Sequence, residues 1–164
     1  MRGRPKKFEH LHRKTKGEWA ELAFIAKATT LGLIVCKAYG ENQPFDFIVY
    51  SRGGGAVRVQ VKSAWARTRA GYHVRARRCT RGYHPGELDY FVILIPPEDA
   101  WYIFPADAVP RGGFAMFYPH RPGSQGRMEK YRDAWHLLTG DPADDTRSLG
   151  LTIHASAEIE PLVR

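Results

Sequence analysis

Cysteine is scarce in this chain of 164 residues, which holds only Cys36 and Cys79. Two cysteines far apart, with no CxxC spacing, indicate neither a disulfide framework nor a zinc site. The longest apolar run, Tyr90 to Ile95, is far too short to cross a bilayer. The basic N-terminus also lacks the apolar centre of a secretory signal. We therefore expect no membrane-embedded part and a reduced, cytoplasmic setting, associated with the nucleoid.

Acidic residues are outnumbered by basic ones, 17 Asp and Glu against 25 Lys and Arg, which gives a formal net charge of +8. Such an excess favours a polyanionic partner, most simply nucleic acid. A hydrophobic content of 43% with 12% aromatics excludes wholesale disorder. The length is enough for a single domain with a real core.

The N-terminal third divides into a basic arm and a helix. Residues 1–14 are basic and aperiodic, so we interpret them as an arm outside the core. A helix is expected from Lys16 to about Leu31. Thr15 is placed to be its N-cap, and Glu18 follows three residues later as in a capping box. Gly32 is placed to end the helix.

Short apolar runs between Gly and Pro residues predict strands in the rest of the chain. We expect strands at 33–39, 45–51, 56–63, 71–77, 90–95, 101–104 and 150–154. The Gly- and Pro-rich stretch 110–126 is expected to be a loop, and 127–139 a second helix in which Tyr131, Trp135 and Leu138 pack inward. These elements predict an α/β (α+β) domain with one mixed sheet flanked by helices.

Two of the expected strands carry polar residues where a plain core strand would not. Asp46 lies in the first, and Arg58, Gln60 and Lys62 share one face of the second, opposite a face of valines. If the strands pair as a hairpin across Gly53–Gly55, an acid, an amide and an amine converge on one place. That combination suits a divalent metal and a phosphate, as in a nuclease site.

The first helix adds two carboxylates to this picture. With 100° per residue, Lys16 and Lys27 fall together and mark the expected solvent side. Glu18 and Glu21 both lie away from them, and an inward carboxylate is costly unless it is paired or bound to a metal. The helix dipole and cap explain Glu18. Glu21 has no such explanation, so we favour it as a site residue.

Taken in order, these motifs resemble the PD-(D/E)XK nuclease superfamily. They are Lys16-Gly17-x-x-x-Glu21 on a helix, then Pro44-Phe45-Asp46, then Gln60-Val61-Lys62. The chain looks most like the bacterial branch related to homing endonucleases of group I introns, in which glutamine replaces the usual acid. The resemblance implies a restriction-endonuclease-like core over residues 15–110. Residues 111–164 would then form a loop, a helix and a tail packed on that core.

The resemblance also implies roles for individual residues. Glu21 and Asp46 match the metal-binding carboxylates, Gln60 takes the acid position, and Lys62 is the lysine of the motif. One Mg²⁺, for which Mn²⁺ would substitute, would be held by Glu21, Asp46 and the carbonyls of Gln60 and Val61. With only two carboxylates, one metal ion fits better than two, because Mg²⁺ is bound by few carboxylates and keeps several waters.

Two basic segments are expected to contact DNA. The arm sequence Arg2-Gly3-Arg4-Pro5-Lys6-Lys7 resembles an AT-hook, whose arginines lie in a narrow minor groove; plain phosphate contact is the simpler alternative. A second basic segment follows the motif lysine and comprises Arg67, Arg69, Arg75 and Arg77. It could hold the DNA backbone beside the cut, or it could simply be a solvated sheet edge.

The sequence therefore predicts a metal-dependent DNA endonuclease that hydrolyses phosphodiester bonds in double-stranded DNA, of the homing type. A homodimer or homotetramer is expected, because one small site cuts one strand and two copies are needed for both. Two alternatives stay open: a Holliday-junction-type resolvase, and a non-catalytic DNA-binding protein on a degenerate nuclease core.

Overall fold

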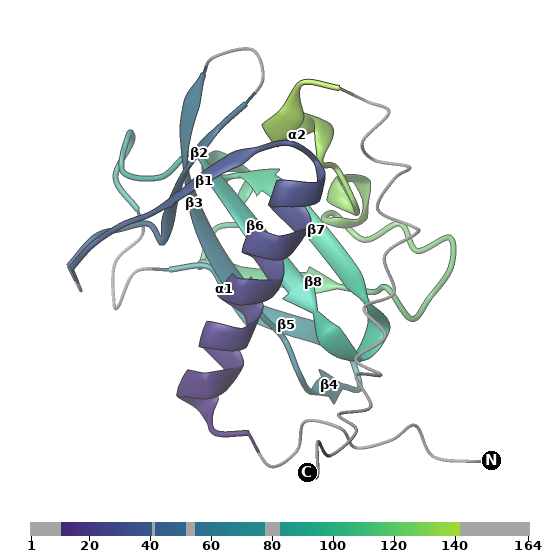
Figure 1. The fold of residues 1–164 in the computed structure, drawn as a ribbon. Helices are drawn as coiled ribbons and strands as arrows, with labels where there is room; N and C mark the ends of the chain where they lie inside the picture. The colour runs from purple at the N-terminus through teal and green to yellow at the C-terminus, as the bar shows by residue number, and fades with distance from the viewer. Residues whose placement is uncertain (1–10, 41, 52–54, 78–82, 142–164) are drawn as a thin grey trace, which may run out of the picture.

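The structure is a computed structural model, which describes residues 11–40, 42–51, 55–77 and 83–141. Its centre is a five-stranded sheet with the strand order β1-β2-β3-β6-β7 (Figure 1). The strands are β1 (Ile34–Lys37), β2 (Phe47–Tyr50), β3 (Ala56–Ser63), β6 (Tyr90–Ile95) and β7 (Ala100–Pro105). The central pair β3 and β6 is parallel and the other neighbours are antiparallel. The predicted mixed sheet is thus confirmed.

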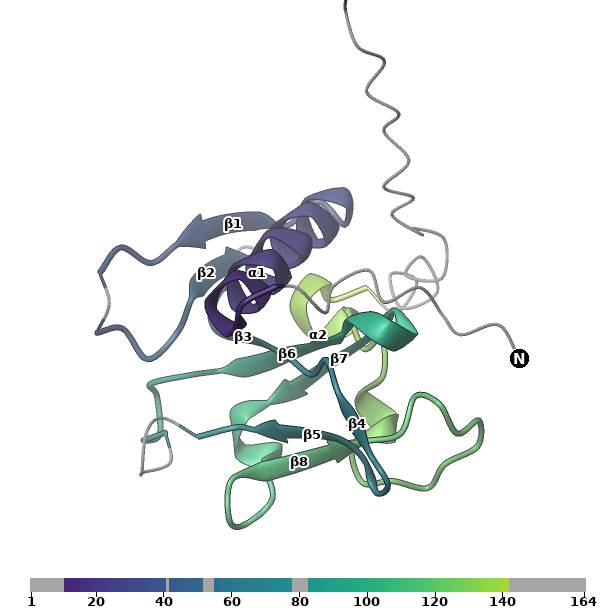
Figure 2. The ribbon, with the colours of Figure 1, turned by 90° about the horizontal axis from the view of Figure 1, so that it is seen from below.

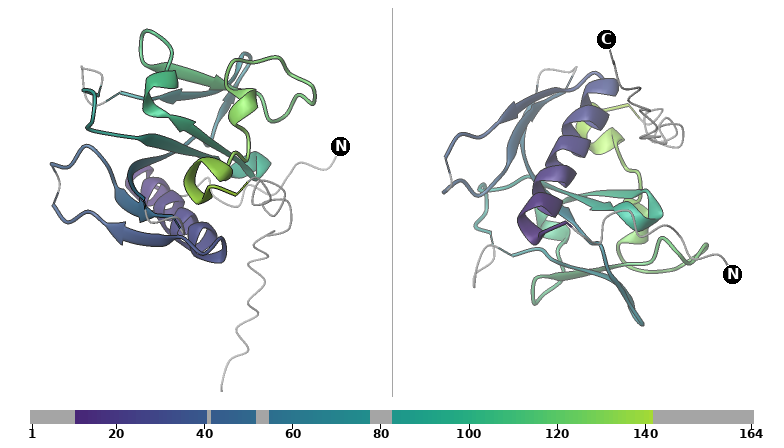
Figure 3. Two further views of the ribbon diagram at one scale, coloured as in Figure 1. Left: turned by 90° about the horizontal axis from the view of Figure 1, so that it is seen from above. Right: turned by 60° about the horizontal axis from the view of Figure 1, so that its bottom comes forward.

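A second sheet, which the sequence did not predict, packs on one face of the first. It has the order β4-β5-β8 and comprises β4 (Arg67–Thr68), β5 (Gly71–Arg75) and β8 (Phe114–Phe117). Helix α1 (Arg13–Thr30) and the short α2 (His136–Thr139) cover the opposite face (Figure 2). The 3₁₀ turns are η1 (Pro96–Glu98), η2 (Ala106–Ala108) and η3 (Glu129–Tyr131). The molecule therefore has three layers, as the view from above also shows (Figure 3).

The central sheet is buried on both faces, and alternate residues of each strand supply two separate cores. On the α1 side, Val59 and Val61 of β3 pack with Val92 and Leu94 of β6. The neighbouring residues of β6 and β7 point to the second sheet, where the core residues are Phe91, Ile93, Ile95, Tyr102 and Phe104. Because β3 contributes valines to only one core, its other face is available for polar residues.

Helix α1 begins earlier than predicted, and its faces differ from the prediction. His12 occupies the N-cap position without a side-chain hydrogen bond, so the predicted Thr15 cap and its capping box are wrong. Lys27, predicted on the solvent side, is buried with its Nζ 5.8 Å from the Trp135 ring centroid. Leu22 is exposed instead. A lysine is a poor marker of solvent because its stem can lie along apolar surface.

The segment predicted as a second helix is mostly not helical. The chain forms only the η3 turn, then an extended Arg132 and a left-handed Asp133 with φ 51°, before the four-residue α2. The reason lies in its two aromatic anchors: Tyr131 packs against the core under the second sheet, whereas Trp135 belongs to the core under α1. The chain must pass the β7 edge between them, which a continuous helix cannot do.

The Gly- and Pro-rich stretch is a further difference from the predicted elements. The stretch 110–126, predicted as a loop, contains strand β8, which pairs with β5. The expected strand at 150–154 and residues 1–10 of the basic arm lie outside the described residues. Arg13 and Lys14, which were assigned to the arm, belong to α1. Within the described part of the chain, no helix is both long enough and apolar enough to cross a membrane.

An ion pair between Arg58 and Asp89, here called the charged clamp, joins the parallel strands β3 and β6 near their N-terminal ends. The Asp89 carboxylate accepts hydrogen bonds from the Arg58 backbone N at 2.7 Å, from its Nε at 2.9 Å and from its second guanidinium nitrogen at 3.0 Å. The backbone of Asp89 also bonds to Arg58 and to Ala106, so one residue links β3, β6 and the turn after β7. Asp89 is therefore a structural ion-pair partner of Arg58.

We predict that Asp89→Asn lowers the free energy of unfolding at pH 7 by about 1–3 kcal/mol, because a charged multi-bond acceptor becomes a neutral one. Burial raises the pKa of Asp89, but the hydrogen bonds from Arg58 outweigh it, so the pKa lies below its ordinary value. The stabilisation is therefore present above the unfolded-state pKa of about 3.9 and is lost as pH falls through the lower folded-state pKa.

Urea denaturation of the two proteins between pH 7 and pH 3 checks this. Their difference should be largest at neutral pH and shrink below about pH 4. Asp107→Asn, at an exposed acid, is the matched control and should stay within about 0.5 kcal/mol of wild type. An equal loss in both variants would contradict the role of the clamp.

Candidate metal and nuclease site

The β2–β3 hairpin places Asp46 beside the polar face of β3. Backbone hydrogen bonds hold Asp46 from both sides: its N donates to the Val59 carbonyl at 2.9 Å, and its carbonyl accepts from the Ala38 N at 3.0 Å. Its side chain then reaches along β3, where Oδ2 accepts the Val61 backbone N–H at 2.8 Å. The Asp46 backbone is thus held by Ala38 and Val59, and its carboxylate is held by β3.

The Gln60 amide connects Asp46 to the neighbouring backbone. Its Nε2 donates to Asp46 Oδ2 and also lies 3.5 Å from the Val61 carbonyl oxygen. Its Oε1 faces the other way, 3.5 Å from the Tyr83 hydroxyl. Asp46 Oδ2 and the Val61 carbonyl oxygen therefore face a common position. The Gln60 amide nitrogen occupies that position. A hard divalent cation takes the same two kinds of oxygen as ligands, so the donor set fits Mg²⁺.

Asp46 lies in an environment that disfavours its charge. Burial raises the pKa of Asp46, and the nearby Glu21 carboxylate raises it as well, against the lowering by the Val61 N–H and the Gln60 amide. A cation bound at Asp46 would offset both the burial of this carboxylate and its repulsion by Glu21. Both the charges around Asp46 and the oxygen atoms beside it thus favour binding of a cation.

Lys62 lies two residues beyond Gln60 on the same face of β3 and is partly buried. Burial lowers the pKa of Lys62; Asp46 opposes this, and the positive charges of Arg13 and Arg75 lower it further. An amine with a depressed pKa is a better proton donor and acceptor at neutral pH than a surface lysine.

Glu21 comes from α1 and approaches the hairpin from the other side. Its Oε2 pairs with Lys37 Nζ at 3.0 Å, and its charge is close enough to act on Asp46. Glu18, by contrast, lies on the exposed side of α1 with Lys14 Nζ at 4.0 Å. The explanation of Glu18 by the helix dipole and cap is wrong, because α1 begins at Arg13 and has no acidic residue in its first turn. The choice of Glu21 as a site residue stays a prediction.

Among the residues that the structure describes, no three His, Cys, Asp or Glu side chains gather into a group that could hold a metal. A metal at this place would depend on Glu21, Asp46 and neutral oxygens from Gln60 and Val61. The Gln60 carbonyl would have to turn toward Asp46 to contribute, since its amide nitrogen now faces that carboxylate.

The predicted DNA-contact residues fall into three groups. Arg67 and Arg69 are exposed at the β4–β5 turn, and Arg75 is exposed on β5, whereas Tyr72 and Val74 of β5 are buried. Arg77 lies away from them, on the wall of a pocket. The remaining group, Arg2, Arg4, Lys6 and Lys7, lies outside the described residues.

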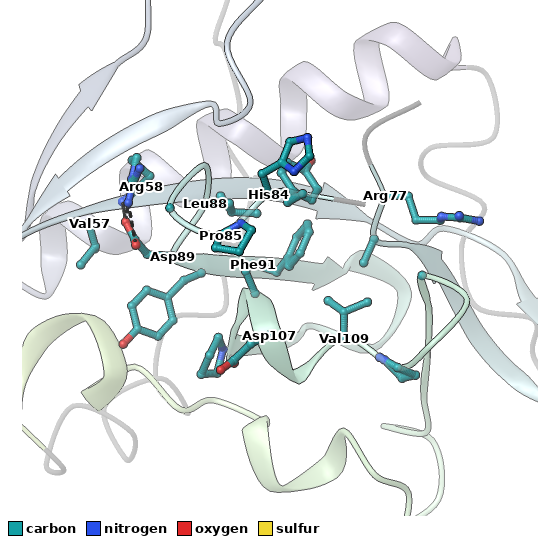
Figure 4. A pocket seen from close by; sticks show the side chains of 18 of the residues that line it. Val57, Arg58, Arg77, His84, Pro85, Leu88, Asp89, Phe91, Asp107 and Val109 are labelled. Carbon is teal, nitrogen blue, oxygen red and sulfur yellow. Dashed lines mark hydrogen bonds and ion pairs between the residues drawn. The ribbon is translucent and has the colours of Figure 1, made fainter. Parts of the chain in front are cut away.

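The pocket beside Arg77 is open and has a volume of about 780 Å³ (Figure 4). Leu88 and Phe91 line its apolar side, and the Arg58–Asp89 ion pair forms part of its charged wall. Tyr83 also lines the pocket, and its hydroxyl lies beside Gln60 Oε1. The pocket is therefore next to the Asp46–Gln60 pair, along the same face of β3.

Three side chains near the site were not singled out from the sequence: Lys37, Tyr83 and Arg13. Lys37 lies opposite Phe47 in the β1–β2 pairing, one residue from the chain position of Asp46. That register depends on the loop between the strands and cannot be read from spacing alone. No pattern in the sequence indicated that Tyr83 would approach Gln60, and Arg13 was assigned to the arm.

The family model for PD-(D/E)XK endonucleases matches residues 11–138, which spans α1, both sheets and most of α2. The chain belongs to the PD-(D/E)XK endonuclease family. Among solved structures, it is similar to the bacterial homing endonuclease I-Ssp6803I, with 28% sequence identity and a TM-score of 0.70. The match covers 81% of this chain and 97% of that one. No curated protein sequence matches the chain.

We predict that Gln60→Glu makes stability depend more strongly on divalent metal. Without metal, the substitution removes the amide donor and places two carboxylates against each other, which is unfavourable. With metal, a third carboxylate strengthens binding, by on the order of tenfold. Melting temperature measured with Mn²⁺ or with EDTA should therefore rise more on metal addition in Gln60→Glu than in wild type. An equal rise in both proteins would count against Gln60 as a ligand.

Proposed function

We propose that this protein is a metal-dependent endonuclease of the homing type that hydrolyses phosphodiester bonds in double-stranded DNA. The observation that carries the proposal is the shared position of Gln60 Nε2 between the Asp46 carboxylate and the Val61 carbonyl, with Lys62 next along the strand. The family of the chain and its similarity to a bacterial homing endonuclease support the same conclusion.

Glu21, Asp46 and the carbonyls of Gln60 and Val61 would hold one Mg²⁺, or Mn²⁺ in its place. When bound, the metal supplies Lewis-acid activation of the scissile phosphate and a lower pKa for a coordinated water. Asp46 has the central position, because its carboxylate is fixed by the backbone of β3 while its backbone pairs with Ala38 and Val59. Glu21 adds the second negative charge from α1.

Lys62 would act on the attacking water and on the phosphate. Its partly buried amine lies on the same strand face as Gln60, so it can orient the water by hydrogen bonding and stabilise negative charge as it develops on the phosphate. Its lowered pKa also lets it accept a proton from that water. The product ends would be a 5′-phosphate and a 3′-hydroxyl.

DNA would lie across the face that carries the basic residues. Arg75 is exposed and close enough to influence Lys62, and Arg67 and Arg69 continue the positive charge along the β4–β5 turn. Arg77, on the pocket wall, is proposed to contact DNA from the other side of Gln60. Arg2, Arg4, Lys6 and Lys7 would extend the contacts from the arm, mainly to phosphates.

A homodimer or homotetramer is proposed as the active form. One Asp46–Lys62 site can cut one strand, and cutting both strands of a duplex calls for two sites related by symmetry. A duplex cleavage site with matching half-sites would follow from such an arrangement.

We predict that Asp46→Ala reduces Mg²⁺-dependent cleavage by at least about a hundredfold, because the best-positioned metal ligand is lost. The substrates are a plasmid pool with randomised inserts and a synthetic four-way junction, each with Mg²⁺ or with EDTA. Asp107→Ala, at an exposed acid, should cleave as wild type does. Circular dichroism verifies that both variants fold.

The pattern of cutting distinguishes the alternatives. Cleavage of linear duplexes that disappears in Asp46→Ala supports the proposal, whereas cutting confined to the junction indicates a resolvase. Tight DNA binding without cleavage by wild type, in Mg²⁺ and in Mn²⁺, would overturn the proposal in favour of a non-catalytic DNA-binding protein.

A further inference from the structure

Lys37 is a cation already paired with one of the two carboxylates of the site. Its Nζ lies 3.0 Å from Glu21 Oε2, at hydrogen-bond distance and joining β1 to α1. Within the described part of the chain, Lys37 is the only residue that hydrogen-bonds to the Glu21 side chain. Any other cation that binds Glu21 therefore shares its carboxylate with this ammonium or displaces it.

The Lys37–Glu21 ion pair lies beside Asp46 and not on a remote surface. Lys37 is followed by Ala38, whose N donates to the Asp46 carbonyl at 3.0 Å, so β1 runs directly beside the Asp46 backbone. The Lys37 ammonium is close enough to Asp46 for the two charges to interact. The Lys37 side chain is 67% exposed, whereas that of Glu21 is only 24% exposed. The carboxylate is thus held in place while the lysine is free to swing out.

We propose that Lys37 is a built-in counter-ion that competes with the metal for Glu21; this inference rests on the proposed function. In the metal-free protein the ammonium neutralises Glu21 and keeps its carboxylate from repelling Asp46. Metal binding at Asp46 and Glu21 displaces Lys37 into solvent. An exposed ion pair is weak, so the competition is modest and a divalent ion overcomes it. Lys37 sets the metal concentration at which the site fills, without being a metal ligand.

The test is Mn²⁺ binding by isothermal titration calorimetry, with the DNA absent so that no cleavage is involved. Lys37→Met keeps most of the side-chain stem but removes the charge, and it should lower the Mn²⁺ dissociation constant by about threefold to fivefold. Lys14→Met is the matched control: it removes the same charge from α1, where Lys14 pairs with exposed Glu18 at 4.0 Å. It should change the dissociation constant by less than about twofold, because solvent screens the more distant charge.

A double-mutant cycle identifies the partner. In the Glu21→Gln background, Lys37→Met should no longer tighten Mn²⁺ binding, because the competition acts through Glu21. Unchanged or weaker binding by Lys37→Met, or equal tightening with and without Glu21, would overturn the inference.

Asp46→Ala, measured in parallel, separates this inference from the proposed function. If Asp46→Ala loses Mn²⁺ binding and Lys37→Met binds as wild type does, only the role of Lys37 fails. If wild type binds no Mn²⁺, or if Asp46→Ala binds it normally, the proposed metal site fails and the competition with it.

Discussion

The hydrogen bonds that Asp46 accepts from β3 are the interaction on which the site depends. They exist because β2 and β3 pair as an antiparallel hairpin in the register that sets Phe47 opposite Val59. A shift of one residue would turn Gln60 and Lys62 toward α1 and the valines toward the second sheet. The two cores prevent that shift, since Val59 and Val61 are buried under α1. The packing of the sheet thus determines where the carboxylate, amide and amine meet.

The layered fold explains why a polar site can exist on a sheet that is buried on both faces. The second sheet and its aromatic core cover β6 and β7, but β3 presents Arg58, Gln60 and Lys62 on that side. The charge of Arg58 is neutralised by Asp89, and the amide of Gln60 is hydrogen-bonded by Asp46 and Tyr83. Lys62 is left beside Asp46 among other positive charges. The chain belongs to the PD-(D/E)XK endonuclease family, and the residues proposed to bind metal and assist cleavage gather on and beside β3.

Local patterns in the sequence predicted the hairpin and the mixed sheet, because strand alternation and turn residues act over a few residues. They failed where tertiary packing decides the outcome. The segment around Tyr131 and Trp135 has helical spacing, yet these two side chains pack into cores on opposite faces of the central sheet. Lys27 was expected in solvent but lies under Trp135. The role inferred for Lys37 depends on the register of β1 against β2, which no local pattern contains.

The most direct measurement is a crystal structure of the protein soaked with Mn²⁺, read by its anomalous scattering. The account predicts a single peak between the Asp46 carboxylate and the Val61 carbonyl, with Glu21 turned toward it and the Gln60 amide nitrogen no longer on Asp46. A peak elsewhere, or no peak with the Asp46–Gln60 hydrogen bond intact, would contradict it.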